Sequence, residues 1–181
     1  MNFISTEFEG LYIIEPKIFK DTRGYFYESY NRSAFEQNGL FFDFVQDNQS
    51  RSQYGVVRGL HYQIGLFAQA KLVRVLEGKV LDVVVDLRTD SKSFGKYYSV
   101  ELSAENQLQF LVPRGFAHGF SVLSENATFL YKCDNFYNKE SERGIMYNDP
   151  ALNIDWKIPL DKMILSPKDM ENKYFEEIDK F

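Results

Sequence analysis

The sequence predicts an all-β protein, an antiparallel sandwich or barrel, from three observations. Short runs rich in valine, leucine and aromatic residues are separated by turn residues along most of the chain. The long helical periods that parallel βαβ units require are absent. Aromatic residues make up 17% of the chain, enough wide side chains to fill a broad interior or to line a ligand cavity.

The predicted strands follow one another in the first three quarters of the chain. Each is a short run of strand-forming residues bounded by residues that favour turns. In chain order they are Leu11–Ile14, Tyr25–Tyr30, Phe42–Gln46, Val56–His61, Leu72–Leu76, Val80–Leu87, Tyr97–Leu102, Gln109–Val112, Gly119–Leu123 and Thr128–Cys133. Between the fifth and sixth strands, Glu77-Gly78-Lys79 predicts a tight hairpin turn.

Helices are expected only as short elements that flank the barrel. Ser33 to Glu36 has the Ser-x-x-Glu pattern of a helix-capping box. Pro167 to Ile178 carries charges at helical spacing. No repeat, low-complexity tract or flexible linker interrupts the chain, so we expect a single domain over residues 1–181.

Alternation along a strand predicts which side chains share a face of the sheet. Asp82, Val84 and Asp86 fall on one face, and so do Phe129, Tyr131 and Cys133. Tyr131 therefore either points into an aromatic interior or packs between two sheets.

Charge and cysteine content limit the partners and the compartment. The chain has 21 Lys and Arg against 26 Asp and Glu and no long basic run, so no nucleic-acid partner is expected. The N-terminus lacks the features of a secretory signal, and no apolar run approaches the roughly 20 residues of a membrane span. The single cysteine, Cys133, cannot form an internal disulfide, which agrees with a reducing compartment. We therefore expect a cytoplasmic protein without a membrane partner.

The two histidines are the first candidates for chemistry, because each lies in a glycine-bounded, strand-like segment beside a cation. They are His61 in VRGLHYQ and His118 in VPRGFAHGF. A histidine base needs a second group to fix its tautomer and to stabilise the imidazolium. Asp82, Asp86 and Asp169 are all candidates for that carboxylate. Arg58 and Lys71, on either side of His61 in the sequence, could stabilise a phosphate or an enolate oxygen.

Other chemistries find less support. A metal site needs three or four ligands, and the two histidines lie on distant segments without an HxH or HxxxH pair, so no metal is expected. The chain has no G-x-S-x-G elbow for a nucleophilic serine and no glycine-rich phosphate loop.

Nine ordered segments resemble the dTDP-4-dehydrorhamnose 3,5-epimerase family of nucleotide-sugar epimerases over nearly the whole chain. They are FKDTRGYFYESY, FVQDNQSRS, VVRGLHYQ, AQAKLVRVLEGKVLDVVVDLR, SFGKYYSVELSAEN, VPRGFAHGF, FLYKCDNFYNKESERGI, NDPALNIDW and LSPKD. The resemblance implies a cupin-type jelly-roll barrel that forms a homodimer through exchanged N-terminal strands and uses no metal or redox cofactor.

The resemblance also implies residue roles. His61 would be the base, Asp169 its dyad partner, Tyr131 the acid on the opposite face of the sugar, and Lys71 the stabiliser of the oxyanion. The resemblance places Arg58 and Arg23 near the diphosphate, with Arg23 supplied by the partner subunit, and Gln46, Asn48 and Ser50 would assist them. The other implied substrate-binding residues are Phe26, Glu28, Tyr137 and His118. Asp82 would hold His118 in place.

Two departures from the family pattern lie beside the expected pocket. Gln49 stands where many members have histidine, and IGLFAQAK lacks a proline often found before AQAK. The sequence therefore does not decide whether the nucleotide is dTDP or GDP, or whether the sugar is a hexose or a heptose. It also leaves open whether inversion occurs at C3 alone or at both C3 and C5.

The first expectation is an epimerase of a nucleotide-linked 4-keto-6-deoxy hexose or 4-keto heptose. It would act in the synthesis of surface-polysaccharide precursors, for capsular polysaccharide or lipopolysaccharide. The alternatives are a 3,4-ketoisomerase on the same barrel, a sugar-nucleotide binding module without turnover, and a metal-dependent cupin.

Overall fold

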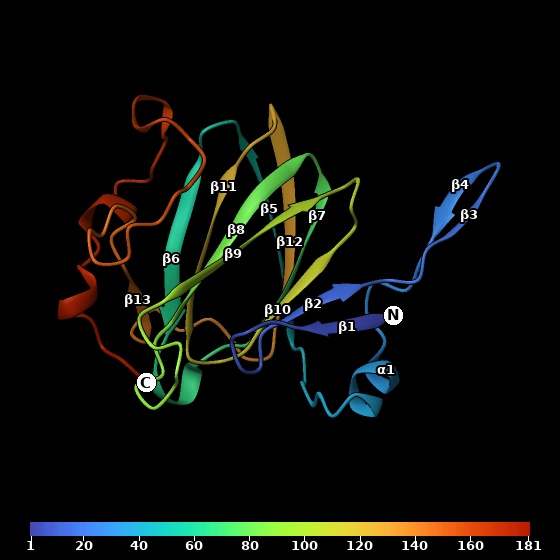
Figure 1. Cartoon of the computed structure of the whole chain (residues 1–181), viewed down its shortest axis with the longest axis horizontal. Coiled ribbons are helices and arrows are strands. Elements are labelled where there is room, and N and C mark those ends of the chain that lie inside the picture. The colour runs from blue at the N-terminus through green and yellow to red at the C-terminus, as the bar shows by residue number, and fades with distance from the viewer.

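Two antiparallel sheets pack face to face in the computed structural model, which describes residues 1–181 (Figure 1). The six-stranded sheet contains, in spatial order, β1 (Asn2–Ser5), β2 (Tyr12–Glu15), β10 (Gln109–Val112), β7 (Lys71–Glu77), β12 (Asn126–Cys133) and β5 (Gln46–Gln53). The five-stranded sheet contains β13 (Glu142–Gly144), β6 (Val57–Gln63), β11 (Phe116–Val122), β8 (Lys79–Asp86) and β9 (Tyr97–Ser103). The predicted antiparallel all-β fold is confirmed.

The main core lies between the sheets. Val73 and Phe129 from the six-stranded sheet meet Val84 and Phe120 from the five-stranded sheet, and the rings of Phe120 and Phe129 stack with centroids 4.3 Å apart. The predicted sharing of one face by Asp82, Val84 and Asp86 is confirmed, and Val84 shows that this face points inward. Tyr131 packs against the edge of this core.

The outer faces of both sheets are also covered. Leu81 and Val83 of β8 pack outward under the C-terminal segment, where Trp156 and Phe175 are buried with them. β8 is therefore apolar on both faces, which is why its sequence is almost continuously hydrophobic. On the other sheet, Phe35 of α1 (Arg32–Gln37) packs in a smaller buried cluster.

The predicted helices are only partly confirmed. Helix α1 forms, but its N-cap is Asn31, whose side chain accepts a hydrogen bond from the Ala34 amide, so the expected start at Ser33 is wrong by two residues. Pro167 to Ile178 is not a helix and contains only the short 3-10 turns η3 (Asp169–Glu171) and η4 (Phe175–Glu177). Asp169 and Phe175 are buried against different parts of the barrel, so the chain follows the sheet instead of coiling.

The predicted Glu77-Gly78-Lys79 hairpin is wrong, because β7 and β8 belong to different sheets. Gly78 has φ 75°, and a Cβ there would lie 1.9 Å from the carbonyl oxygen of Asn126. The glycine is required where the chain crosses from one sheet to the other.

Polar and very short strands escaped prediction. Strand β5 begins at Gln46, where the expected Phe42–Gln46 strand was to end, and is polar along its whole length. Strands β1, β3 (Phe19–Asp21) and β13 were not expected, and β4 (Gly24–Phe26) is shorter than the expected Tyr25–Tyr30. The further 3-10 turns are η1 (Gly65–Phe67) and η2 (Leu160–Lys162).

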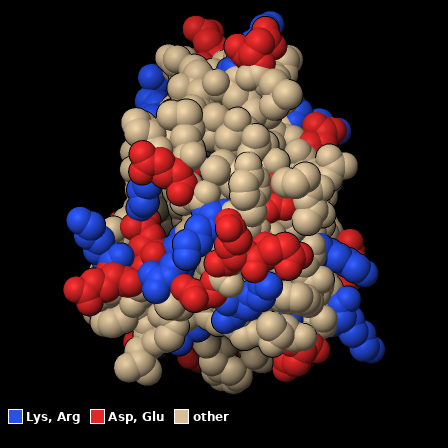
Figure 2. All heavy atoms as spheres, turned by 90° about the vertical axis from the view of Figure 1, so that its left-hand side faces the viewer, with Lys and Arg blue, Asp and Glu red and all other residues tan.

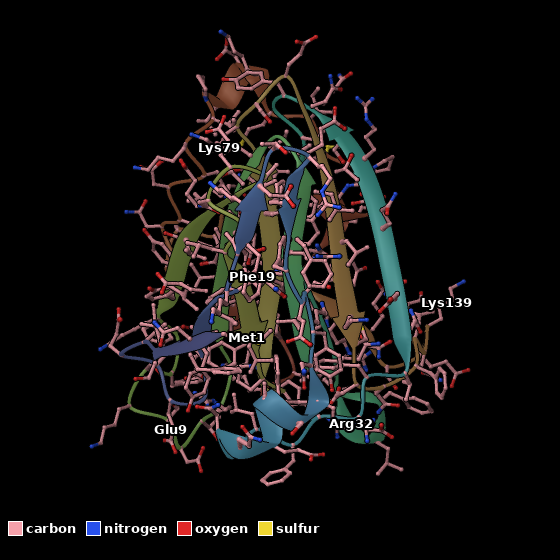
Figure 3. All side chains as sticks on the ribbon, turned by 90° about the vertical axis from the view of Figure 1, so that its right-hand side faces the viewer. Met1, Glu9, Phe19, Arg32, Lys79 and Lys139 are labelled. Atoms are coloured by element: carbon pink, nitrogen blue, oxygen red, sulfur yellow. The ribbon has the colours of Figure 1, made fainter.

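The β3–β4 hairpin projects away from the barrel (Figure 1). Phe19, Tyr25 and Phe26 on it are more than half exposed, and Figure 3 shows Phe19 standing in front of the sheet. On the opposite side of the molecule, acidic and basic side chains are interspersed rather than segregated (Figure 2). None of the helices has the length and apolar character needed to cross a membrane.

Candidate active site

A cleft lies between the two sheets. Its main chamber has a volume of about 590 Å³, within the roughly 300–1,000 Å³ of small-molecule sites. A smaller chamber of about 190 Å³ adjoins it, and both are lined by Asn48, His61, Lys71 and Tyr131. We call the two chambers together the cleft. The expected base and the expected acid therefore face the same space.

A buried carboxylate holds His61 on β6. The His61 Nε2 lies 2.5 Å from Oδ1 of Asp169, whose side chain is 4% exposed. The other oxygen of Asp169 accepts a hydrogen bond from the Ser166 hydroxyl at 2.9 Å. Burial alone would raise the pKa of Asp169, but the hydrogen bonds from His61 and Ser166 outweigh it and keep this pKa below its ordinary value. Asp169 is therefore an anion that orients the ring and leaves Nδ1 of His61 for a ligand.

A β-bulge in β6 brings two of the expected site residues into the cleft. Arg58 and His61 are three residues apart, and a regular strand would direct them to opposite faces. Between the two positions, however, β6 advances three residues while β11 advances two. Gly59 in this interval has φ 119°, and a Cβ there would lie 2.6 Å from the Cα of Gly119. Both Arg58 and His61 line the main chamber.

The facing wall comes from the six-stranded sheet. Tyr131 on β12 pairs with Val73 on β7, and Lys71 is two residues from Val73, so Tyr131 and Lys71 lie on the same face. The ammonium of Lys71 is 5.9 Å from the centre of the Tyr131 ring. Burial raises the pKa of Tyr131 and lowers the pKa of Lys71. The phenol therefore keeps its proton at neutral pH, and the amine can lose its charge more readily than an exposed lysine.

His118 lies in the interior of the cleft and is held as expected. Its Nε2 lies 2.9 and 3.0 Å from the two oxygens of Asp82, which is fully buried. Burial raises the pKa of Asp82, and His118 opposes that rise. Three carboxylates were considered as the partner of His61. Asp82 instead pairs with His118, and Asp86 binds Arg88 at 2.7 Å, so Asp169 is the one that contacts His61. No group of three or more His, Cys, Asp or Glu side chains is placed to share a metal ion.

Strand β5 provides a polar wall for the cleft. Its alternate side chains face the same way as Tyr131, which pairs with Asn48 across the ladder. They are Gln46, Asn48 and Ser50, and Gln46 donates to Asn48 at 2.9 Å. The guanidinium of Arg58 donates through Nε to Ser52 at 3.1 Å, which leaves its terminal nitrogens for an anion.

Three of the expected substrate-binding residues lie outside the cleft of their own chain. Arg23 is 87% exposed and pairs with Asp21 on the projecting hairpin. Phe26, on the same hairpin, is 67% exposed. Glu28 is exposed and accepts a hydrogen bond from Asn31 at 3.0 Å. A single chain therefore does not bring these three residues to His61.

Two charged residues of the site were missed by sequence reasoning. Glu142 lines the small chamber with Tyr137, whose phenol donates to it at 2.8 Å, and Lys168 lines the main chamber. The ammonium of Lys168 lies 2.5 Å from the same Glu142 oxygen. Lys168 could have been suspected because it directly precedes Asp169. Glu142 gives no such signal, since it lies in a three-residue edge strand within a charged stretch.

The fold and the site together define a class of protein. A jelly-roll barrel of the cupin type carries a histidine on one sheet, paired with a carboxylate from the C-terminal segment, and a protonated phenol beside a lysine on the other sheet. Such an arrangement is suited to moving protons to and from a carbon next to a carbonyl group.

The family model for dTDP-4-dehydrorhamnose 3,5-epimerase matches residues 5–177, and the chain belongs to this family. It is 55% identical over 170 residues to the dTDP-4-dehydrorhamnose 3,5-epimerase of Escherichia coli K12, covering 93% of this chain and 91% of that protein. It is 51% identical to the enzyme of the same name from Shigella flexneri, covering 100% and 99% of the two chains.

Solved structures give the same result. The dTDP-4-dehydrorhamnose 3,5-epimerase from Elizabethkingia anophelis NUHP1 superposes with a TM-score of 0.94 at 62% identity, covering 98% of this chain and 97% of that one. The dTDP-6-deoxy-D-glucose-3,5-epimerase from Legionella pneumophila, solved in complex with dTDP-4-keto-L-rhamnose, also has a TM-score of 0.94, at 52% identity and with 98% and 94% coverage.

Proposed function

We propose that this protein is an isomerase that inverts C3 and C5 of a dTDP-linked 4-keto-6-deoxy hexose by proton transfer alone. One observation carries the proposal. His61 and Tyr131 project into the same cleft from opposite sheets, with Lys71 beside Tyr131. The whole reaction is assigned to one domain over residues 1–181.

The first step is removal of a proton from the carbon next to the ketone. This proton is acidic because the resulting carbanion delocalises onto the ketone oxygen as an enolate. His61 takes it through Nδ1, and Asp169 stabilises the imidazolium that forms. Lys71 donates a hydrogen bond to the enolate oxygen, in a site enclosed enough for that bond to be strong.

The second step delivers a proton to the opposite face of the same carbon. Tyr131 is the donor, because burial raises its pKa and keeps the phenol protonated. One turnover leaves His61 protonated and Tyr131 deprotonated. His61 must therefore release a proton to solvent, and Tyr131 must take one up, before the next turnover. Hydrogen from water therefore enters every inverted centre.

The substrate class follows from the relatives and from the polar wall. The E. coli and Shigella relatives are named as dTDP-sugar 3,5-epimerases, which favours dTDP over GDP and a hexose over a heptose. Arg58 and the amides of β5 are suited to the diphosphate and the nucleoside. A 3'-monoepimerase from Streptomyces bikiniensis is also similar, but at 32% identity, so inversion at both carbons is the better-supported assignment.

The proposal includes a homodimer in which exchanged N-terminal strands place Arg23 and Phe26 over the cleft of the other copy. The support is the hairpin itself, because three of its aromatic side chains, Phe19, Tyr25 and Phe26, are more than half exposed although they lie on a paired β-ribbon. We assign the reaction to the cytoplasm and the product to the synthesis of surface-polysaccharide precursors.

A co-expression experiment tests the dimer. In the proposed dimer each site combines His61 of one chain with Arg23 of the other. Arg23→Ala therefore inactivates the site on the partner chain, whereas His61→Asn inactivates the site on the chain that carries it. A mixed dimer then keeps one intact site, so co-expression recovers about a quarter of wild-type activity from two inactive variants. Recovery indistinguishable from zero, with mixed dimers present by mass spectrometry, would refute the exchange.

Solvent exchange tests the reaction. In D₂O the purified protein is expected to place deuterium at C3 and C5 of the dTDP-linked ketosugar and to give the inverted product by NMR. The His61→Asn variant should bind dTDP but exchange nothing. A 3-keto product would indicate a ketoisomerase, and a wild type that binds without any exchange would indicate a binding module.

A further inference from the structure

Glu142 occupies a position at the cleft that the proposed chemistry does not use. It lies on β13 and pairs with Gln63 of β6, while Gly144 pairs with His61. His61 and Gln63 are two residues apart on the same strand, so the Glu142 carboxylate lies on the same side of the sheet as the His61 ring. Its side chain is only 17% exposed.

One oxygen of Glu142 joins two segments that are distant in sequence. Its Oε2 accepts the Tyr137 hydroxyl at 2.8 Å and lies 2.5 Å from the ammonium of Lys168. Tyr137 belongs to the loop after β12, and Lys168 belongs to the C-terminal segment that lies along the five-stranded sheet (Figure 1). Lys168 directly precedes Asp169, so this contact also fixes the segment that supplies the dyad carboxylate.

The Glu142 side chain is ionised at neutral pH. Burial alone would raise its pKa, but the bonds from Lys168 and Tyr137, with a contribution from His61, keep the pKa below its ordinary value. Charged and titratable groups line the chambers around His61 from every neighbouring element. They are Asp169 and Lys168 on the C-terminal segment, Glu142 on β13, Tyr137 on the loop after β12, Lys71 on β7, Tyr131 on β12, Arg58 and Tyr62 on β6, and His118 on β11. Within this set, Glu142 and Asp169 are the two carboxylates that lie near the imidazole.

We infer that Glu142 is a positioning residue that ties Tyr137 and Lys168 together at the cleft and acts, beside Asp169, as a second negative charge on His61. The inference rests on the proposed function, because it is a role in the same acid–base site. The tether holds the two segments around the sugar nucleotide. The charge favours the imidazolium that forms when His61 takes a proton.

An isolated surface ion pair would not have this effect, and the chain supplies one for comparison. Glu77 pairs with Arg51 at 3.2 Å on the outer surface, with both side chains more than half exposed. Glu77→Gln is therefore the matched control for Glu142→Gln, since each removes one charge from an ion pair that links different strands or segments.

The test is a titration of the His61 ring by carbon NMR. The chain has only two histidines, so His118→Gln assigns the signals. Glu142→Gln is expected to move the His61 midpoint to lower pH by a few tenths of a unit, and Lys168→Met is expected to move it to higher pH. Glu142→Asp keeps the charge and should restore the midpoint, while the shorter side chain loses the tether. Glu77→Gln should change nothing.

Steady-state kinetics test the tether. Glu142→Gln is expected to lower kcat/KM about tenfold, and Tyr137→Phe to raise KM with little change in kcat. Shifts in the same direction for Glu142→Gln and Lys168→Met, or midpoints that do not move, would overturn the inference. Wild-type protein without solvent exchange refutes the proposed function instead, and the titration still decides the role of Glu142. A fall in thermal stability alone, with midpoint and kinetics intact, would reduce Glu142 to a structural role.

Discussion

Asp169→Asn is the sharpest test of the dyad, because it removes a charge and almost no volume. In the native site the carboxylate accepts the His61 Nε2–H at 2.5 Å and a hydroxyl from Ser166. Hydrogen bonds to charged groups contribute roughly 1.5–3 kcal/mol. Asp169 stabilises the imidazolium much more than the neutral ring, so this contribution falls mainly on the transition state. At tenfold per about 1.4 kcal/mol, kcat should fall by about 10- to 150-fold with little change in KM.

The assay is the initial rate of deuterium entry at C3, measured at saturating substrate from pH 5 to pH 9. Ser166→Ala is the control, because it removes a hydrogen bond from Asp169 but leaves the charge beside His61. It should cost less than Asp169→Asn at every pH. If Asp169→Asn retained turnover within twofold of wild type while remaining folded, the carboxylate would have no part in stabilising the base.

Three further predictions test the acid, the bulge and the stability. Tyr131→Phe should reduce inversion by about 10²–10⁴ while His61 still exchanges substrate hydrogen without inversion, and equal loss of both in D₂O would contradict the assignment. Gly59→Ala should destabilise the fold by about 2–4 kcal/mol in urea unfolding, because its Cβ would meet Gly119 at 2.6 Å; a smaller cost would mean that the bulge relaxes. Burial alone would raise the pKa of Asp86, but hydrogen bonds led by Arg88 keep it below its ordinary value, so its contribution is full above about pH 4 and is lost as pH falls through the lowered value. Asp86→Asn should therefore flatten the acid side of the curve of thermal midpoint against pH, and an unchanged curve would count against this role.

Burial made parts of the fold predictable from sequence. Strand β8 is packed on both faces, so its apolar run could be read directly, and alternation placed Asp82 and Val84 on one face, which is the inner face in the structure. The same rule gave two possible places for Tyr131, and the structure has its side chain lining the cleft at the edge of the core. In these strands the local pattern and the tertiary environment agree.

Other parts depended on contacts that no local pattern contains. Strand β5 was missed because one of its faces meets solvent and the other lines a polar cleft, so neither face is apolar. The pairing of His61 with Asp169 joins residues 108 positions apart. Arg58 shares the chamber with His61 only because of the bulge at Gly59, and simple alternation would have separated them. Glycine within a strand was the one available signal of that bulge.

The position of the site in the sandwich limits how two carbons can be inverted. The proposed base is on β6, which only the short β13 separates from the edge of one sheet, and the proposed acid is on β12, which only β5 separates from the edge of the other. Hydrogen-bonded strands of this kind do not exchange places during a reaction, so base and acid keep fixed positions on opposite sides of the cleft. The sugar ring must therefore present C3 and C5 to the same two groups in turn, by shifting or flipping within the cleft. In the proposed binding mode the nucleotide can stay bound meanwhile, because the polar wall of β5 and the guanidinium of Arg58 are assigned to the part of the ligand that does not react.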